Sequence, residues 1–240
     1  MVESIKKLRE ICQKPVLNSN TWYQRKVTRK ISIYFTLLLI HLGVSGNVAS
    51  MIMLITGLIA SSFFTLGNYS AYLAGVLLLQ FWYVLDHVDG ELARYWKKTS
   101  AKGIFIDKLT HHIIHPFIYL FLGIGLWKQL NNPLMLILGS FTAYFLLLQD
   151  LINIDKRDSL IASNINKTKK ELNQKSNMFG ALFTKVSLIV YKVPGLMNIL
   201  TLAAIFNLLY YVFLFYAITF PIMILIKIIY NLSIPDNKFK

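Results

Sequence analysis

Three carboxylates, an arginine and several histidines lie at the ends of two apolar segments in the middle of the chain. Asp86 and Asp89 are three residues apart, so on a helix both carboxylates point to one side. Asp107 and His111 are four residues apart, which places them in a second stripe on the following helix. Facing lipid, the charged groups, with Arg94, would cost on the order of 10 kcal/mol together, so we expect them to line a wet cavity walled by protein.

The two stripes, facing each other, would form a cage for a metal ion. Clustered carboxylate oxygens suit a hard divalent cation, Mg²⁺ or Mn²⁺, which holds phosphates through its open or water-filled positions. Gly90 and Ala93 remove side-chain bulk where a ligand could come close to the helix backbone. This pattern outlines a site for a nucleotide diphosphate. The predicted metal ligands are Asp86, Asp89, Asp107 and His111.

The same positions resemble the signature of the CDP-alcohol phosphotransferase family. The last of the eight signature positions departs from the family, in which it is normally a fourth aspartate. Just upstream, the turn Gly46-Asn47-Val48-Ala49-Ser50 stands where the branch containing inositol-phosphate transferases opens its first spanning helix with Pro-Asn-x-x-Thr. The signature of this chain reads Asp86-x2-Asp89-Gly90-x2-Ala93-Arg94-x8-Gly103-x3-Asp107-x3-His111.

The resemblance implies transfer of a phosphoalcohol group, phosphatidyl or phosphopolyol, from a CDP-alcohol to an acceptor hydroxyl, with release of CMP. The donor would be CDP-diacylglycerol or a CDP-polyol, and the acceptor a polyol phosphate or a lipid, in phospholipid or polyol-phosphodiester biosynthesis. Such a reaction needs a metal ion that bridges the phosphate oxygens. The resemblance also implies a homodimer, and it assigns the cytidine and diphosphate pocket to Asn47, Gly90, Ala93, Arg94 and Gly103.

His111 stands where the family has an aspartate that deprotonates the attacking hydroxyl and touches a second metal ion. Much of a histidine population is neutral at cytoplasmic pH, so the imidazole can still act as a general base. The resemblance therefore makes His111 and Asp107 the predicted catalytic residues. Because Mg²⁺ prefers oxygen to imidazole, we predict one tightly bound metal ion and a second that is weak, absent or replaced by a softer ion.

Two other functions stay open at the level of sequence. Loss of the fourth carboxylate is compatible with a CDP-binding pseudoenzyme in a scaffolding role. Rows of aspartate and histidine inside a membrane also suit a divalent-cation transporter, although the small residues between the two stripes have no use there. The other histidines have structural interpretations: a helix–helix hydrogen bond for His112, a cap beside Pro116 for His115, and packing for His87.

Composition and charge placement indicate a membrane protein. The 240 residues are 55% apolar, which favours a small membrane bundle. The net charge of +14 is not spread evenly, because among the lysines and arginines only Lys128 falls in a segment predicted to lie outside. This positive-inside pattern predicts cytoplasmic termini and an active site facing the cytoplasm, and it argues against nucleic-acid binding.

The predicted architecture is an all-α integral membrane protein with six transmembrane helices. We expect three regions: 1–46 as a cytoplasmic or interfacial amphipathic part, 47–232 as the transmembrane domain, and 233–240 as a cytoplasmic tail. By apolar length, the spanning helices are predicted at 47–66, 69–96, 103–127, 133–154, 195–212 and 214–232.

The polar segments are predicted to serve the membrane surface and the acceptor. Basic residues with Trp22 and Tyr23 among them indicate an amphipathic segment on an anionic leaflet, and the apolar stretch 31–42 is too short to span and ends at a glycine. In the polar connection after the fourth span, Lys156 and Arg157 are candidates for binding an anionic acceptor, or simply charges that set the topology.

Overall fold

In the computed structural model, which describes residues 3–162 and 194–232, every regular element is helical. The all-α prediction is therefore confirmed for this part of the chain. The α-helices are α1 (Ile5–Leu8), α2 (Arg29–His41), α3 (Gly46–Phe63), α4 (Tyr69–Tyr95), α5 (Ala101–Leu130), α6 (Leu134–Ala162), α9 (Gly195–Ile205) and α10 (Leu209–Leu232). Short π and 3-10 turns are η1 (Arg9–Gln13), η2 (Lys14–Ser19), η3 (Gln24–Thr28) and η4 (Phe64–Leu66).

Five helices in the described ranges are long and apolar enough to cross a membrane. The first four agree with the predicted spans to within a few residues, and the protein is an integral membrane protein. Their bounds are Gly46–Leu66, Tyr69–Tyr95, Ala101–Leu130, Leu134–Asp155 and Leu209–Ile229.

The prediction of two further spans at 195–212 and 214–232 misplaces a break in the chain. The described helix α9 ends at Ile205, Asn207 adopts a left-handed backbone with φ of 55°, and α10 already begins at Leu209. Asparagine tolerates this conformation better than most residues, which explains a turn inside an apolar stretch. With 11 residues, α9 is shorter than a spanning helix, so the described residues do not reach the predicted count of six.

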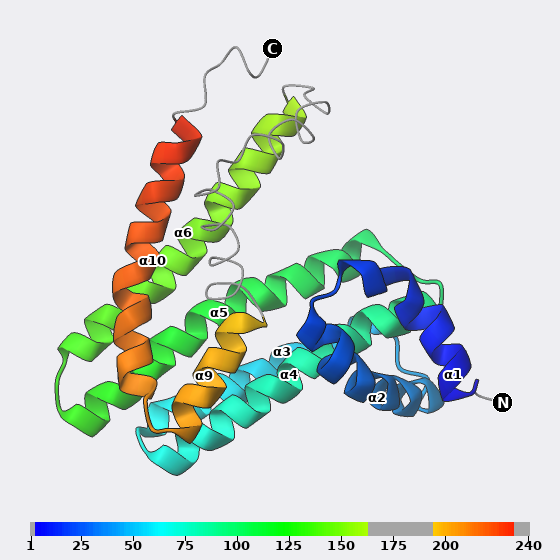
Figure 1. Ribbon diagram of the computed structural model, residues 1–240, viewed down its shortest axis with the longest axis horizontal. Helices are drawn as coiled ribbons and strands as arrows, with labels where there is room; N and C mark the ends of the chain where they lie inside the picture. Colours follow the sequence, from blue (N-terminus) through cyan, green and yellow to red (C-terminus); the bar gives the residue numbers. More distant parts are fainter. Residues whose placement is uncertain (1–2, 163–193, 233–240) are drawn as a thin grey trace.

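Figure 1 shows how the long helices are arranged. Helix α3 packs against both α4 and α5, and α9 lies along α4. Helices α6 and α10 lie side by side and lean away from α5 towards the end where α10 finishes. The N-terminal part, with α1 and α2, covers the end of α4 that leads towards α5.

Large aromatic side chains fill the space between α4, α5 and α10. Trp82, Tyr83, Tyr119, Phe213 and Tyr216 are among the largest fully buried side chains, and all belong to one apolar cluster. Where α5 meets α6 the backbones themselves touch, since a Cβ added at residue 139 would lie 2.8 Å from the carbonyl oxygen of residue 119. Such close contact fixes the position of α5, on which half of the site depends.

A second apolar cluster joins the N-terminal part to α4. It contains Leu8 and Cys12 from the first turns, Ile33 from α2, and Val88 and Leu92 from α4. Helix α2 ends two residues before Gly43, whose φ of 67° is the left-handed conformation that glycine allows, as the sequence predicts. The N-terminal part is thus packed on the helix that carries the first two aspartates.

Candidate metal and nucleotide site

The site is built where α4 ends and α5 begins. Ser100 caps α5 by accepting a hydrogen bond from the backbone N–H of Gly103 at 3.0 Å, and Ser45 caps α3 in the same way with Val48. Between α4 and α5 the chain turns through Lys97, which has a φ of 51°. This tight connection lets α5 run back along α4, so the two predicted stripes face each other.

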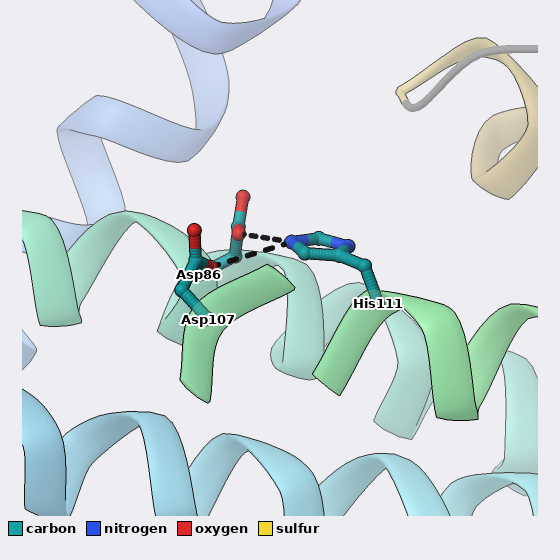
Figure 2. A group of neighbouring side chains, drawn as sticks. All are labelled: Asp86, Asp107 and His111. Atoms are coloured by element: carbon teal, nitrogen blue, oxygen red, sulfur yellow. Dashed lines mark hydrogen bonds and ion pairs between the residues drawn. The ribbon is translucent and has the colours of Figure 1, made fainter. Parts of the chain in front are cut away.

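Asp86, Asp107 and His111 come together as a possible metal-binding group. One ligand atom of each lies within 4.8 Å of the others. The Nε2 atom of His111 is 2.8 Å from Oδ1 of Asp86 and 3.6 Å from Oδ1 of Asp107. Figure 2 shows both carboxylates directed at the imidazole ring from their two helices. Three of the four predicted metal ligands therefore meet.

Asp89, the fourth predicted ligand, is turned to a different neighbour. Its carboxylate accepts hydrogen bonds from the hydroxyl of Ser50 at 2.6 Å and from the backbone N–H of Gly90 at 2.5 Å. Asp89 is therefore not part of the group that Asp86, Asp107 and His111 form, although it lines the same cavity as Asp107. Ser50 stands at the Thr position of the entry turn noted in the sequence, but its bond to Asp89 was not predicted, because the two residues lie on different helices.

The His111 imidazole is held from several sides. A carboxylate only accepts, so Nε2 is the donor in its bond with Asp86. The ring also lies edge-on against Trp82, with centroids 5.0 Å apart, and against His115 at 5.3 Å. These contacts hold the ring between the carboxylates of Asp86 and Asp107.

A cavity of about 210 Å³ opens beside this group. It brings together all five residues predicted to shape the cytidine and diphosphate pocket, and Asp89 and Asp107 as well. Four further residues around it, from the α4–α5 connection and the start of α5, were not predicted. The lining residues are Gly46, Asn47, Ser50, Asp89, Gly90, Ala93, Arg94, Lys98, Thr99, Ser100, Gly103, Ile104 and Asp107.

Both positive and negative groups line the cavity. Two long helices, α3 and α5, begin at the cavity, and their N-terminal N–H groups carry partial positive charge. Arg94 and Lys98 add positive charge, while Asp89 and Asp107 supply negative charge. An anion that carries a divalent cation would therefore meet positive groups for its own charge and carboxylates for its cation.

Two signature glycines lie against polar side chains at the cavity wall. A Cβ at Gly103 would be 2.7 Å from the Oδ1 atom of Asn47, so a larger residue there would displace that amide. A Cβ at Gly90 would be 3.3 Å from a guanidinium nitrogen of Arg94. The glycines thus leave space for polar groups at the cavity wall, as the sequence pattern indicates.

The other histidines occupy structural positions. His112 pairs with Asp150 of α6 at 2.7 Å, which agrees with the predicted helix–helix hydrogen bond. His115 is packed against Trp82 with centroids 5.7 Å apart, and α5 continues through Pro116 without a break. His87 contacts the carbonyl oxygen of Tyr83 at 3.1 Å through Nδ1, which agrees with a packing role.

The predicted acceptor residues lie at the edge of what the structure describes. Lys156 and Arg157 belong to the last turns of α6, for which only the backbone is described. The rest of the polar connection, residues 163–193, lies outside the described residues, and so does the predicted tail, 233–240. Their role in binding an acceptor stays a prediction.

Comparison with known proteins yields one family and no curated relative. A search of curated proteins found no match to the chain. The family model described as CDP-alcohol phosphatidyltransferase matches residues 46–229, from the first residue of α3 to near the end of α10. This range covers most of the chain and includes the metal group and the cavity. The chain belongs to the CDP-alcohol phosphatidyltransferase family.

Proposed function

We propose that the chain is an active enzyme that transfers a phosphoalcohol group from a CDP-alcohol to an acceptor hydroxyl, with a divalent cation held between α4 and α5. Its family carries out such transfer in lipid biosynthesis. One observation carries the proposal: Asp107 belongs to the metal-binding group and also lines the cavity. A cation on that carboxylate would touch a diphosphate lying in the cavity.

The donor set fits a divalent cation. Asp86 and Asp107 provide the oxygens that Mg²⁺ and Mn²⁺ prefer, and the imidazole of His111 is a weaker ligand for Mg²⁺. The family depends on divalent metals. When bound, the cation would neutralise charge on the phosphate oxygens and help to orient the donor. We assign Asp89 to the edge of this site, where a change of its rotamer would add a further carboxylate.

The positive side of the cavity would bind the diphosphate. Arg94 and Lys98, with the N-terminus of α5 at Ser100, would hold the phosphate oxygens. The small residues would leave room for the cytidine beside Asn47, whose amide can donate and accept hydrogen bonds.

The chemical step is a displacement at phosphorus. The acceptor oxygen attacks the phosphorus that carries the alcohol, the bond from that phosphorus to the CMP oxygen breaks, and CMP leaves. The hydroxyl proton passes to the Asp107 carboxylate, whose Oδ1 atom lies 3.6 Å from Nε2 of His111, because that nitrogen already carries the hydrogen that it donates to Asp86. Asp86 orients the imidazole through its bond at 2.8 Å.

The experiment that tests the proposal measures CMP release. Purified protein in lipid nanodiscs is incubated with CDP-diacylglycerol, CDP-glycerol, CDP-inositol or CDP-ribitol, together with Mg²⁺ or Mn²⁺ and a lipid extract. One donor should yield CMP, the yield should fall to background with EDTA, and Asp107→Asn should lose activity by about 10²-fold or more. Thr56→Val is a matched control, because Thr56 lies outside the cavity lining and its hydroxyl bonds to its own helix.

The other outcomes separate the alternatives. Binding of CDP without CMP release from any donor would indicate a pseudoenzyme. Uptake of radiolabelled divalent ions into proteoliposomes, without CDP binding, would indicate a transporter.

We further propose a homodimer with its sites on the cytoplasmic side, in which Lys156 and Arg157 bind an anionic acceptor such as a polyol phosphate.

A further inference from the structure

Glu91 lies inside the signature of α4, yet its side chain is turned away from the cavity. The side chain is fully buried. Its Oε1 atom accepts hydrogen bonds from Arg29 at 2.8 Å, Gln13 at 2.9 Å and Ser32 at 2.7 Å, and its Oε2 atom accepts one from Thr36 at 2.6 Å. All four donors belong to the N-terminal segment, which we define as residues 3–44.

This network fixes the N-terminal segment on α4. A buried carboxylate that is paired with a guanidinium and has both oxygens hydrogen-bonded is well satisfied. Removing its charge would leave Arg29 buried without its counter-ion, which is strongly unfavourable. Gln13 ties the network together, because its amide also donates to the backbone oxygen of Arg29 at 2.7 Å.

The same stretch of the segment reaches the cavity. The residue before Gln13 is Cys12, and its backbone oxygen accepts a hydrogen bond from Nε of Arg94 at 2.5 Å. Arg94 lines the cavity, while Glu91 stands three residues earlier on α4. Gln13 therefore bonds to the buried Glu91, and the neighbouring Cys12 bonds to Arg94, which lines the cavity.

We propose that the N-terminal segment is a positioning element of the donor site: by holding Glu91, it places the Cys12 carbonyl so that the Arg94 guanidinium stays directed at the diphosphate. The inference rests on the proposed function, because it requires Arg94 to bind the donor. An arginine held in one rotamer loses less side-chain entropy when it binds an anion, so the held state binds more tightly. Glu91 and Gln13 act through Arg94 and touch no substrate.

Kinetics separate positioning from general stability. Glu91→Gln and the milder Gln13→Leu should each raise KM for the donor by about tenfold, with kcat little changed, because a ground-state contact is weakened. Tyr23→Phe is the matched control, since it removes another bond between the segment and α4, from Tyr23 to Gln80 at 3.1 Å. That control should leave KM unchanged.

A double substitution tests the route through Arg94. Lysine at this position has no Nε–H to donate to Cys12, so Arg94→Lys should raise KM by itself, and Gln13→Leu should add nothing in that background. Additive effects, or an equal rise in KM for Tyr23→Phe, would overturn the inference. Unchanged KM in both Glu91→Gln and Gln13→Leu would overturn it as well.

Alkylation of Cys12 supplies a second readout. Cys12 is fully buried in the apolar cluster between the segment and α4, and this burial raises the pKa of its thiol to about 11. Iodoacetamide should therefore react slowly with the wild type at pH 8, and faster by about tenfold with Glu91→Gln. By reciprocity, saturating CDP with Mg²⁺ should slow the reaction in the wild type and not in Arg94→Lys. Equal slowing in both would contradict the inference.

The two proposals fail in different ways. If the wild type neither binds CDP nor releases CMP, the proposed function is wrong, while alkylation without ligand still shows whether Glu91 holds the segment. If CMP is released but Glu91→Gln and Gln13→Leu have the same donor KM as the wild type, the proposed function stands and the positioning role is wrong.

Discussion

At the scale of single residues, the main question is what His111 does to the metal group. The carboxylates of Asp86 and Asp107 already converge on its Nε2 atom. An imidazole that donates to one carboxylate reduces the negative charge available to a cation. We therefore expect the histidine to weaken a second ion more than the first, and the prediction of one tight and one weak or absent ion stays a prediction.

Replacing this histidine tests that expectation. His111→Asp would add a carboxylate oxygen to Asp86 and Asp107, so half-maximal activity should need about tenfold less Mg²⁺. The measurement is a Mg²⁺ titration of CMP release, with His111→Asn as the control of similar size but without charge. An unchanged titration in His111→Asp would show that the imidazole has no special role in metal binding.

The bond from Ser50 to Asp89 is a residue-scale feature that was not predicted from the sequence. Its hydroxyl donates to Asp89 at 2.6 Å inside a nearly closed environment. A hydrogen bond to a buried carboxylate is worth about 1.5–3 kcal/mol, so Ser50→Ala should lower kcat/KM for the donor by about tenfold or more. Thr56→Ala on the same helix should leave it unchanged. If both variants behave alike, Asp89 does not depend on Ser50.

At the scale of elements, the success of the sequence reasoning follows from locality. Asp86, Asp89, Asp107 and His111 all lie on one helical hairpin, so their spacing within two helices predicts which faces meet. Partners far apart in sequence were not predictable in this way. Glu91 bonds residues that precede it by 55 to 78 positions, and nothing in their types marks them as a set.

The same argument explains the errors in the fold. The break at Asn207 falls in a continuous apolar run, where length alone gives no boundary. Asp89 lies on the predicted face of α4, but its carboxylate accepts a hydrogen bond from a serine of α3 and is not part of the metal-binding group. Side-chain direction at a three-helix junction depends on all three helices, and periodicity describes only one at a time.

The contact between α5 and α6 gives an element-scale prediction. His112 and Asp150 bond at 2.7 Å across the two helices. Hydrogen bonds between membrane helices are typically worth about 1 kcal/mol, so a double-mutant cycle with His112→Ala and Asp150→Asn should show coupling of that size in unfolding by denaturing detergent. Thr110→Val is a suitable control, because Thr110 bonds to its own helix. No coupling would mean that the pair is incidental.

At the scale of the whole molecule, the proposed orientation rests on charge placement and on exposed apolar side chains. On α2, the side chains of Ile31, Tyr34 and Leu38 are exposed in one stripe, and Trp22 is 67% exposed before it. Basic residues border this stripe, as an anionic leaflet would require. These features are the basis for the proposal that the N-terminal segment and the cavity lie on the same, cytoplasmic, side.

Cysteine labelling checks this orientation. In a Cys12→Ser background, Lys128→Cys reports on the end of α5 and Lys102→Cys on its beginning. A membrane-impermeant maleimide should label Lys128→Cys in intact cells and Lys102→Cys only after permeabilisation. The opposite pattern would put the site outside. Labelling of both variants in intact cells would show that α5 does not span the membrane.

The order of the chain has a consequence for biosynthesis. Every described residue of the cavity and of the metal group lies between Gly46 and His111, before α6 begins. During synthesis, α3, α4 and the first half of α5 can therefore enter the bilayer with the whole acidic cluster before the remaining helices leave the ribosome. Arg94, which lies on the same hairpin, can offset part of the charge of the aspartates at insertion, and the later helices then cover a centre that already exists.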